Sequence, residues 1–430
     1  MAARTGSRLG VFLGGELLGE LERRGPARYR FEYADSALRS GPAGAVVLSA
    51  SLPLRPEAFG PSQAAPYFEG LLPEGSVRTA IARSLRISEQ DGFGLLEAIG
   101  AECAGAVAVL PQGAAPKPPG GGSLRLLEAE ELGKMIEDLP RNPLGVSASP
   151  DGARLSLGGV QHKLVLSRRP RGSARPHPAE FSLPLDGAPS TCLLKPELGE
   201  YEDLATNELF CMRIAADAQL RVAHSDLLRV GSTTCLYVER FDRMHREGEI
   251  MRIHQEDMCQ ALGVLPAAKY EENGGPSLAG IVGLLRRLRG SFMARDINDL
   301  IHAALVNFLV GNSDAHGKNF ALLYERDAGV RLAPLYDLVS TAVYPDVTDR
   351  MAMRIGGVGD PDRVDIESWR RLAEECGLGG GIAPLIRRRT ASVLRSAELW
   401  REAAKLEGWH RPVIDAIVDV CHRRAGQLTA

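Results

Sequence analysis

The chain has 430 residues, which suits two or three domains better than a single core. With 44% hydrophobic and 24% charged residues, and with 51 Lys+Arg against 54 Asp+Glu, it has the composition of an ordinary globular protein whose overall charge does not demand a nucleic-acid partner. The seven cysteines form no CxxC pair and no cysteine–histidine cluster, which argues against a disulfide scaffold or a zinc site and favours reduced core thiols in a cytosolic protein.

The N-terminal segment is predicted to be α+β. Strands are expected at residues 9–12 and 17–21, which flank Gly14-Gly15 as a hairpin, at residues 29–33, and at residues 106–110, with a further extended piece over residues 46–54. Helices are expected at residues 65–72, at residues 76–85 with Ser76 as N-cap, and at residues 89–99.

The first residues of the chain carry two arginines and no apolar core of signal-peptide length. No window approaches the roughly 18 consecutive apolar residues of a membrane span. We therefore expect a cytoplasmic protein without a membrane partner.

The clearest linker is PQGAAPKPPGGGS, which ends at residue 123. Such a proline- and glycine-rich stretch cannot bury enough apolar surface to hold one conformation. The sequence therefore predicts a small α+β domain over residues 1–112 and a linker over residues 113–123.

The rest of the chain is strand-rich first and helical afterwards. Residues 129–139 and 206–216 have helical spacing, residues 163–166 and 192–194 predict strands, and residues 227–230 and 235–238 predict a hairpin around Gly231. Beyond residue 254, helical spacing recurs over residues 255–262, 277–288, 297–310, 368–376, 386–406 and 413–424. This order predicts two lobes of one catalytic unit: a strand-rich lobe over residues 124–253 and an all-helical lobe over residues 254–430.

Residues 311–320, GNSDAHGKNF, place four polar groups directly after an apolar helix. Asp314 and Asn319 stand five apart, as the aspartate and asparagine do in a protein-kinase catalytic loop. There the aspartate takes or orients the proton of the attacking hydroxyl, and the asparagine oxygen ligates magnesium. Aspartate and asparagine also cap helices and form turns, so this spacing alone leaves a structural role open.

Further kinase parts occur along the chain in a consistent order. Gly158 and Gly159 could form a glycine loop that covers phosphates, or a plain hairpin turn. Lys195 ends an apolar strand, where it could contact phosphates or reach solvent. The segment VERFDR leaves a strand near Glu239 and could join the two lobes. Asp337 lies in an apolar run, where it could be a second magnesium ligand or could form a hydrogen bond to the backbone in a turn.

These segments resemble HipA-type serine/threonine kinases, the toxins of bacterial toxin–antitoxin pairs. The resemblance rests on SLGGVQHK, LLKP, the TNE helix, YVERFDR, HQEDMCQALG, KYEENGGP, GNSDAHGKNF and APLYDLVS, and on YFEGLLPEGSVR in the N-terminal domain. It covers nearly the whole chain. Gly158 and His162 depart from the family, which usually has alanine, and glutamate or proline, at these positions.

The resemblance implies a role for each matching position. Asp314 would be the catalytic base, Asn319 and Asp337 would hold Mg2+, and Ser156 would be an autophosphorylation site that ejects its loop and switches the kinase off. Asp242 would contact the ribose of ATP. The full set of ATP-binding residues would be Gly158, Gly159, Val160, Gln161, His162, Lys163, Lys195, Glu239, Arg240, Phe241, Asp242, His316, Lys318, Asn319 and Asp337.

The resemblance also implies partners and a substrate class. The antitoxin would be a HipB-like helix-turn-helix protein that binds DNA, so the kinase would meet DNA only indirectly. The substrate would be an aminoacyl-tRNA synthetase such as glutamate–tRNA ligase, and its phosphorylation would cause growth arrest or persistence. Two alternatives stay open at this point: a small-molecule kinase of the same plan, and a catalytically silent co-repressor. Arg387, Arg388 and Arg389 are expected to face solvent.

Overall fold

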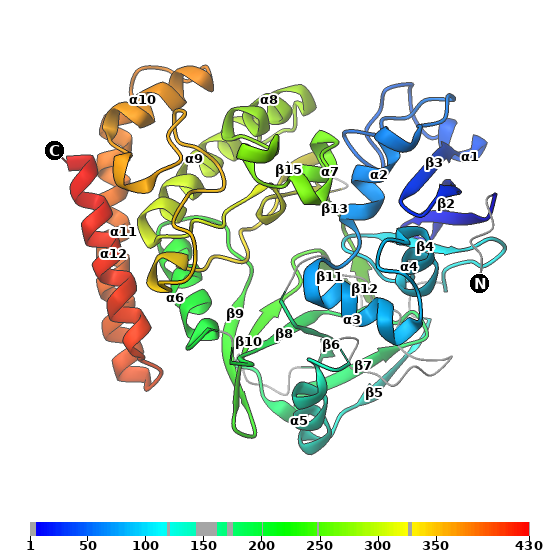
Figure 1. Cartoon of the computed structure of the whole chain (residues 1–430), viewed down its shortest axis with the longest axis horizontal. Coiled ribbons are helices and arrows are strands. Elements are labelled where there is room, and N and C mark those ends of the chain that lie inside the picture. The colour runs from blue at the N-terminus through cyan, green and yellow to red at the C-terminus, as the bar shows by residue number, and fades with distance from the viewer. Residues whose placement is uncertain are drawn as a thin grey trace. The chain divides into compact units, whose positions relative to one another are not determined.

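The computed structural model describes residues 6–117, 121–142, 161–169, 175–199, 201–246, 249–325 and 329–429. The chain forms two compact units (Figure 1). The first unit contains Met1–Pro196 and Leu228–Ala267, and the second contains Glu197–Leu227 and Ala268–Ala430. The predicted domain boundaries at residues 112, 123 and 253 stay predictions.

The first unit begins with a four-stranded antiparallel sheet in the order β3-β2-β1-β4. Its strands are β1 (Arg8–Leu13), β2 (Glu16–Gly25), β3 (Arg28–Tyr33) and β4 (Val107–Pro111). The predicted hairpin is confirmed: Gly14 and Gly15 both have positive φ, which the two-residue turn between β1 and β2 requires. Helices α1 (Asp35–Leu38), α2 (Pro61–Gly70), α3 (Gly75–Leu85) and α4 (Gly92–Ile99) lie between β3 and β4 in the chain. The core is rich in aromatic rings, with Phe31 against Phe68 and Tyr33.

Two local predictions in this region are wrong. Residues 46–54 do not form a strand; Ser49 and Leu52 close a turn, and the Ser49 hydroxyl accepts a hydrogen bond from the backbone of Ser51. Ser76 is not the N-cap of α3, because the helix already begins at Gly75 with Glu74 as its N-cap.

A six-stranded sheet in the order β5-β7-β6-β8-β10-β9 follows. Its strands are β5 (Ser123–Leu126), β6 (Leu164–Arg168), β7 (Phe181–Leu185), β8 (Cys192–Pro196), β9 (Ser225–Val230) and β10 (Thr233–Glu239). The helix α5 (Ala129–Asp138) buries Leu132 and Ile136 in the core of this sheet. The predicted hairpin around Gly231 is confirmed by neighbouring β9 and β10.

The first unit ends with β11 (Arg243–Arg246), β12 (Glu249–Arg252), β13 (His254–Asp257) and α7 (Met258–Leu262). The helix predicted over residues 255–262 is thus partly wrong. Asp257 caps α7 by accepting the N–H of Gln260 across 2.9 Å, so the three residues before it stay extended.

The second unit is mainly helical. It contains α6 (Leu204–Asp217), α8 (Leu278–Leu288), α9 (Met293–Val310), α10 (Ile366–Glu375), α11 (Ile382–Glu407) and α12 (Pro412–Thr429), and α11 and α12 run side by side (Figure 1). The central helix is α9, since residues 300–310 are all buried. The predicted helices are confirmed, and a β-hairpin of β14 (Ala321–Glu325) and β15 (Gly329–Leu332) is added to the expected all-helical lobe.

Short 3-10 turns complete the chain at Pro178–Glu180, Pro266–Ala268, Glu271–Asn273, Gly317–Asn319, Thr341–Val343 and Pro361–Arg363. The predicted α+β class with strand-rich and helical regions is confirmed, and all seven cysteines are buried, as expected of core thiols. In the described ranges, no helix combines the length and the apolar character that crossing a bilayer requires.

Candidate active site

The loop that carries Asp314 begins where α9 ends. Gly311 caps that helix in the left-handed region with φ +79°, and a β-carbon there would stand 2.8 Å from Cβ of Ala342 and 2.9 Å from Cγ1 of Val420. Glycine is therefore the residue that this turn accepts. The Gly311 carbonyl in turn accepts the N–H groups of Thr341 and Ala342, at 2.9 and 3.0 Å. These bonds fix the loop onto a segment 30 residues further along the chain.

Asp314 presents a half-exposed carboxylate on this loop. Its own N–H donates to Oδ1 of Asn312 across 3.2 Å, and its Oδ1 accepts the hydroxyl of Tyr270 across 2.7 Å. Its Oδ2 lies 4.0 Å from Nε2 of His316. A carboxylate that is exposed yet held by neighbours suits a group that must orient an incoming hydroxyl.

His316 is buried beside Asp314. Burial lowers its pKa to about 3, with the cation of Lys269 as the next cause. The imidazole is therefore neutral near pH 7, and its approach to Asp314 is not an ion pair there. Its ring meets the Tyr270 ring edge to face, with centroids 5.3 Å apart, so His316 supports the tyrosine that bonds to Asp314.

Asn319 and Asp337 come together although they stand 18 residues apart. Nδ2 of Asn319 donates to Oδ2 of Asp337 across 2.9 Å, and Oδ1 of Asn319 accepts the N–H of His316 across 3.2 Å. Asp337 holds a left-handed backbone with φ +59°, which few residues other than glycine adopt. The backbone carbonyl of Lys318 accepts the hydroxyl of Tyr336 across 2.7 Å, which ties the two segments together a second time.

The donor set of Asn319 and Asp337 fits Mg2+. Mg2+ prefers hard oxygen ligands such as a carboxylate and an amide oxygen. It usually takes only some of its ligands from the protein and the others from water and phosphate. An amide oxygen has two lone pairs, and His316 uses one of those on Oδ1 of Asn319. Within the described ranges, no group of three or more histidine, cysteine, aspartate or glutamate side chains could hold a metal by itself.

The remaining described site residues belong to the first unit. Lys195 lies on β8, opposite Leu236 of β10, and is only 8% exposed, which argues against a lysine that simply reaches solvent. Gln161, His162 and Lys163 are half-buried just before β6. Ser156, Gly158, Gly159 and Val160 lie outside the described residues.

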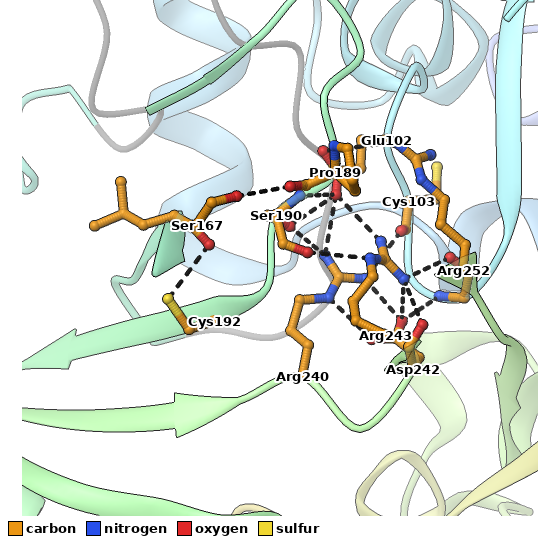
Figure 2. Close-up of polar contacts among 12 residues, drawn as sticks. Glu102, Cys103, Ser167, Pro189, Ser190, Cys192, Arg240, Asp242, Arg243 and Arg252 are labelled. Atoms are coloured by element: carbon orange, nitrogen blue, oxygen red, sulfur yellow. Dashed lines mark hydrogen bonds and ion pairs between the residues drawn. The ribbon is translucent and has the colours of Figure 1, made fainter. Parts of the chain in front are cut away.

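From Glu239, the last residue of β10, to Asp242, more exposed and buried side chains alternate. Glu239 is exposed and Phe241 half-buried, whereas Arg240 and Asp242 point into a buried cluster of charges (Figure 2). The Asp242 carboxylate accepts Nε of Arg240 (2.9 Å), the N–H of Gly105 (2.7 Å) and Nε2 of Gln255 (3.0 Å). The carboxylate that the resemblance assigns to the ribose is thus engaged inside the protein and 1% exposed. Burial raises its pKa, but Arg240 and Arg243 lower it further, and the net pKa lies below the usual range.

Sequence reasoning assigned no role to Tyr270 or to Glu102, the partner of Arg243 in this cluster. Tyr270 belongs to KYEENGGP, one of the segments on which the family resemblance rests. The resemblance therefore pointed to this segment, but residue spacing did not predict a role for the tyrosine. Glu102 stands in no motif.

Known proteins resemble the chain over most of its length. Residues 9–110 match the family described as HipA N-terminal domain, and residues 155–402 match the HipA-like C-terminal domain. The chain is 38% identical over 392 residues to Y4mE of Sinorhizobium fredii, which covers 90% of this chain and 89% of that protein. It is 34% identical over 387 residues to the serine/threonine-protein kinase toxin HipA of Shewanella oneidensis, covering 86% and 83% of the two chains.

A solved structure agrees with these similarities. The complex of HipA, HipB and operator DNA from Shewanella oneidensis MR-1 contains a chain that superposes with a TM-score of 0.77 at 29% identity. The superposition covers 98% of this chain and 97% of that one.

Proposed function

This chain belongs to the HipA family and is a protein kinase, and we propose that it transfers the γ-phosphoryl group of ATP to a serine or threonine hydroxyl of a protein. The observation that carries the proposal is the hydrogen bond from Nδ2 of Asn319, on the loop that also presents Asp314, to Oδ2 of Asp337 on a second segment, 2.9 Å long. A base and a pair of metal ligands are the parts that phosphoryl transfer asks of a kinase catalytic loop.

The loop residues and the side chains that contact them each have a role in this proposal. Asp314 accepts the proton of the attacking hydroxyl and orients it toward phosphorus. Asn319 and Asp337 hold Mg2+, which when bound neutralises charge on the phosphate oxygens. The neutral His316 supports the Tyr270 ring, and the ammonium group of Lys318 adds positive charge near the phosphates.

The nucleotide itself is assigned to residues of the first unit and its glycine loop. Residues 158–163 cover the phosphates through backbone N–H groups, and Lys195 contacts a phosphate oxygen as a buried cation. Glu239 and Phe241 present backbone groups to adenine. Arg240 and Asp242 belong to the same segment, but their side chains are buried in the charge cluster. In this proposal they contribute to the nucleotide site through the position of the backbone and not through side-chain contacts.

Autophosphorylation at Ser156 is proposed as the off-switch. A phosphate carries about two negative charges, which would compete with the ATP phosphates for the same loop. Ser156→Ala is therefore expected to stay active and to be more toxic to cells than the wild type at matched protein level. Equal or lower toxicity would contradict the switch but not the kinase.

The partners follow from the relatives. We propose a HipB-like helix-turn-helix antitoxin, because the Shewanella HipA was solved with HipB and operator DNA. An aminoacyl-tRNA synthetase is the substrate class that the family resemblance offers, with growth arrest or persistence as the result. With such a substrate and ATP as the phosphate donor, the proposed site of the reaction is the cytoplasm.

The test is incubation of the full chain with ATP and Mg2+, followed by mass spectrometry and a nucleotide-binding measurement. The wild type should acquire phosphate on serine or threonine, whereas Asp314→Ala should bind ATP and acquire none. Binding without phosphate in both proteins would favour a silent co-repressor. Phosphate transfer to a small molecule alone would favour a small-molecule kinase, and no nucleotide binding at all would refute the proposal.

A further inference from the structure

A buried cluster of charges joins the N-terminal sheet region to the segment after β10. Its members are Glu102, from the connection between α4 and β4, and Arg240, Asp242 and Arg243 (Figure 2). All four side chains are at most 4% exposed. In Figure 2 the two guanidinium groups lie between the carboxylates of Glu102 and Asp242.

Glu102 makes three hydrogen bonds through one oxygen. Oε1 accepts the N–H of Ser190 (3.0 Å), the hydroxyl of Ser190 (2.7 Å) and Nη2 of Arg243 (3.1 Å). It also lies 3.5 Å from Nη1 of Arg240. Ser190 extends the link, since its hydroxyl accepts Nη1 of Arg240 across 2.9 Å. One carboxylate of the N-terminal region thus restrains both arginines.

The backbone around Glu102 also contacts the segment. Arg240 donates to the carbonyl of Cys103 (3.3 Å), Arg243 donates to the carbonyl of Gly105 (2.9 Å), and the N–H of Gly105 donates to Asp242 (2.7 Å). Gly105 has φ +73°, and a β-carbon there would stand 2.6 Å from the backbone nitrogen of Gln255. The close approach of the two segments therefore depends on a glycine.

The charges of the cluster depend on one another. Burial raises the pKa of Glu102, but Arg252, Arg243 and Arg240 lower it more, so that carboxylate is ionised. Burial and the neighbouring Arg240 lower the pKa of Arg243 to about 10. Loss of the Glu102 charge would leave two buried guanidinium groups on the single carboxylate of Asp242, an arrangement that is costly in a dry interior. The arginines would then move, and the backbone that carries them would move with them.

That backbone is the segment to which adenine is assigned. It is held at both ends by main-chain bonds, from the N–H of Arg240 to the carbonyl of Thr191 and from the N–H of Ile253 to the carbonyl of Asp242, each 2.9 Å long. Between these bonds its path depends on the buried side chains of Arg240 and Asp242.

We propose that Glu102 is a positioning residue of the nucleotide site, which fixes the backbone of residues 239–242 through Arg240 and Arg243 and so sets the affinity for the adenosine part of ATP. The inference rests on the proposed function, since it takes this segment to face adenine. It makes the N-terminal domain a determinant of nucleotide binding without any contact between Glu102 and the nucleotide.

The test compares two probes on full-length variants by calorimetry: a non-hydrolysable ATP analogue with Mg2+, and inorganic tripolyphosphate. Glu102→Gln should raise the Kd of the ATP analogue about tenfold, and the milder Ser190→Ala about threefold. Both should bind tripolyphosphate as the wild type does, because the phosphate contacts are untouched. Turnover at saturating ATP should stay near the wild-type value, so the effect falls on KM.

The matched control is Glu69→Gln. Glu69 is a buried carboxylate of the same N-terminal domain, paired with Arg78 across 2.8 Å, and is not a member of the cluster. Its variant should bind the ATP analogue within about twofold of the wild type. An unchanged Kd for the ATP analogue in folded Glu102→Gln would overturn the inference. If Glu102→Gln does not fold, an unchanged Kd in Ser190→Ala would overturn it in the same way. An equal loss of affinity in Glu69→Gln would also overturn it. A wild type that binds no ATP analogue would refute the proposed function as well.

Discussion

The hydroxyl of Tyr270 donates a hydrogen bond to Oδ1 of Asp314 across 2.7 Å, although the two residues stand 44 positions apart in the chain. A hydroxyl that donates to this carboxylate makes the same kind of contact that a serine or threonine acceptor would make during transfer. The contact with Tyr270 shows that the Asp314 carboxylate accepts a hydrogen bond from a hydroxyl group. It also holds an otherwise half-exposed side chain in one orientation.

Tyr270→Phe removes this hydrogen bond and keeps the ring that meets His316. Because Asp314 then gains rotamer freedom, we expect kcat to fall roughly three- to tenfold with the KM for ATP unchanged. The measurement is the rate of phosphate incorporation from labelled ATP. Tyr336→Phe is the matched control, since its hydroxyl binds the Lys318 carbonyl on the same loop and not Asp314. A faster Tyr270→Phe would mean that the hydroxyl blocks the base.

Asp337→Asn tests the proposed metal site. Asparagine keeps the shape of the side chain and tolerates the left-handed backbone at this position, but it removes the negative charge. We expect the Mg2+ concentration for half-maximal activity to rise roughly tenfold, with activity partly recovered at high Mg2+. Asp296→Asn, which alters a buried carboxylate that bonds to the N–H of Leu332, should leave the Mg2+ dependence unchanged. Equal Mg2+ curves for Asp337→Asn and the wild type would contradict the assignment.

Gly311→Ala and Gly408→Ala form a matched pair. Both glycines cap a helix in the left-handed region, at φ +79° and +78°. A β-carbon at Gly408 meets nothing within 4 Å, so alanine there should cost only the backbone strain of about 1–2 kcal/mol. At Gly311 the same strain is joined by the clash with Ala342 and Val420, and the free energy of unfolding should fall further.

Denaturant unfolding measures both effects, and the kinase assay adds a second readout. Gly311→Ala should also lose activity, because Asp314 follows three residues later on the displaced loop. Equal destabilisation of the two variants would show that Ala342 and Val420 move away from the new β-carbon without a further loss in the free energy of unfolding.

The stability of the protein should fall in acid through its buried histidines. Burial, followed by the charge of Arg389, lowers the pKa of His302 to about 4, below the usual value of 6.5. The unfolded chain binds a proton at higher pH than the folded one, so this stability is complete above about pH 6.5 and is lost as the pH falls toward 4. Each such histidine contributes a slope of about 1.4 kcal/mol per pH unit in that window.

His302→Leu removes this titration while filling the same buried position on α9. The free energy of unfolding of the variant, measured by urea titration from pH 7.5 to 4.5, should therefore fall less steeply than that of the wild type. His254, with its pKa lowered to about 4, should keep part of the acid sensitivity in both proteins. Identical slopes would contradict the assignment to His302.

Local patterns predicted most of the elements. Apolar spacing identified α8, α10, α11 and α12, since apolar residues recur every three to four positions in a helix that buries one face. Glycine pairs marked the β1–β2 hairpin because few other residues adopt positive φ. The errors over residues 46–54 and 255–257 arose where the side chains of Ser49 and Asp257 accept backbone N–H groups, which ends or replaces a regular pattern.

The sequence by itself determined the family and the Asp314–Asn319 spacing, because both lie in contiguous segments whose order along the chain carries the information. Only the tertiary structure decided that Asn319 meets Asp337, that Tyr270 bonds to Asp314, and that Glu102 restrains Arg243 from 141 positions away. Such contacts depend on which surfaces the packed elements bring together. A buried carboxylate must find cations wherever the fold places them, since leaving it unpaired costs several kcal/mol. No local pattern encodes that choice of partner.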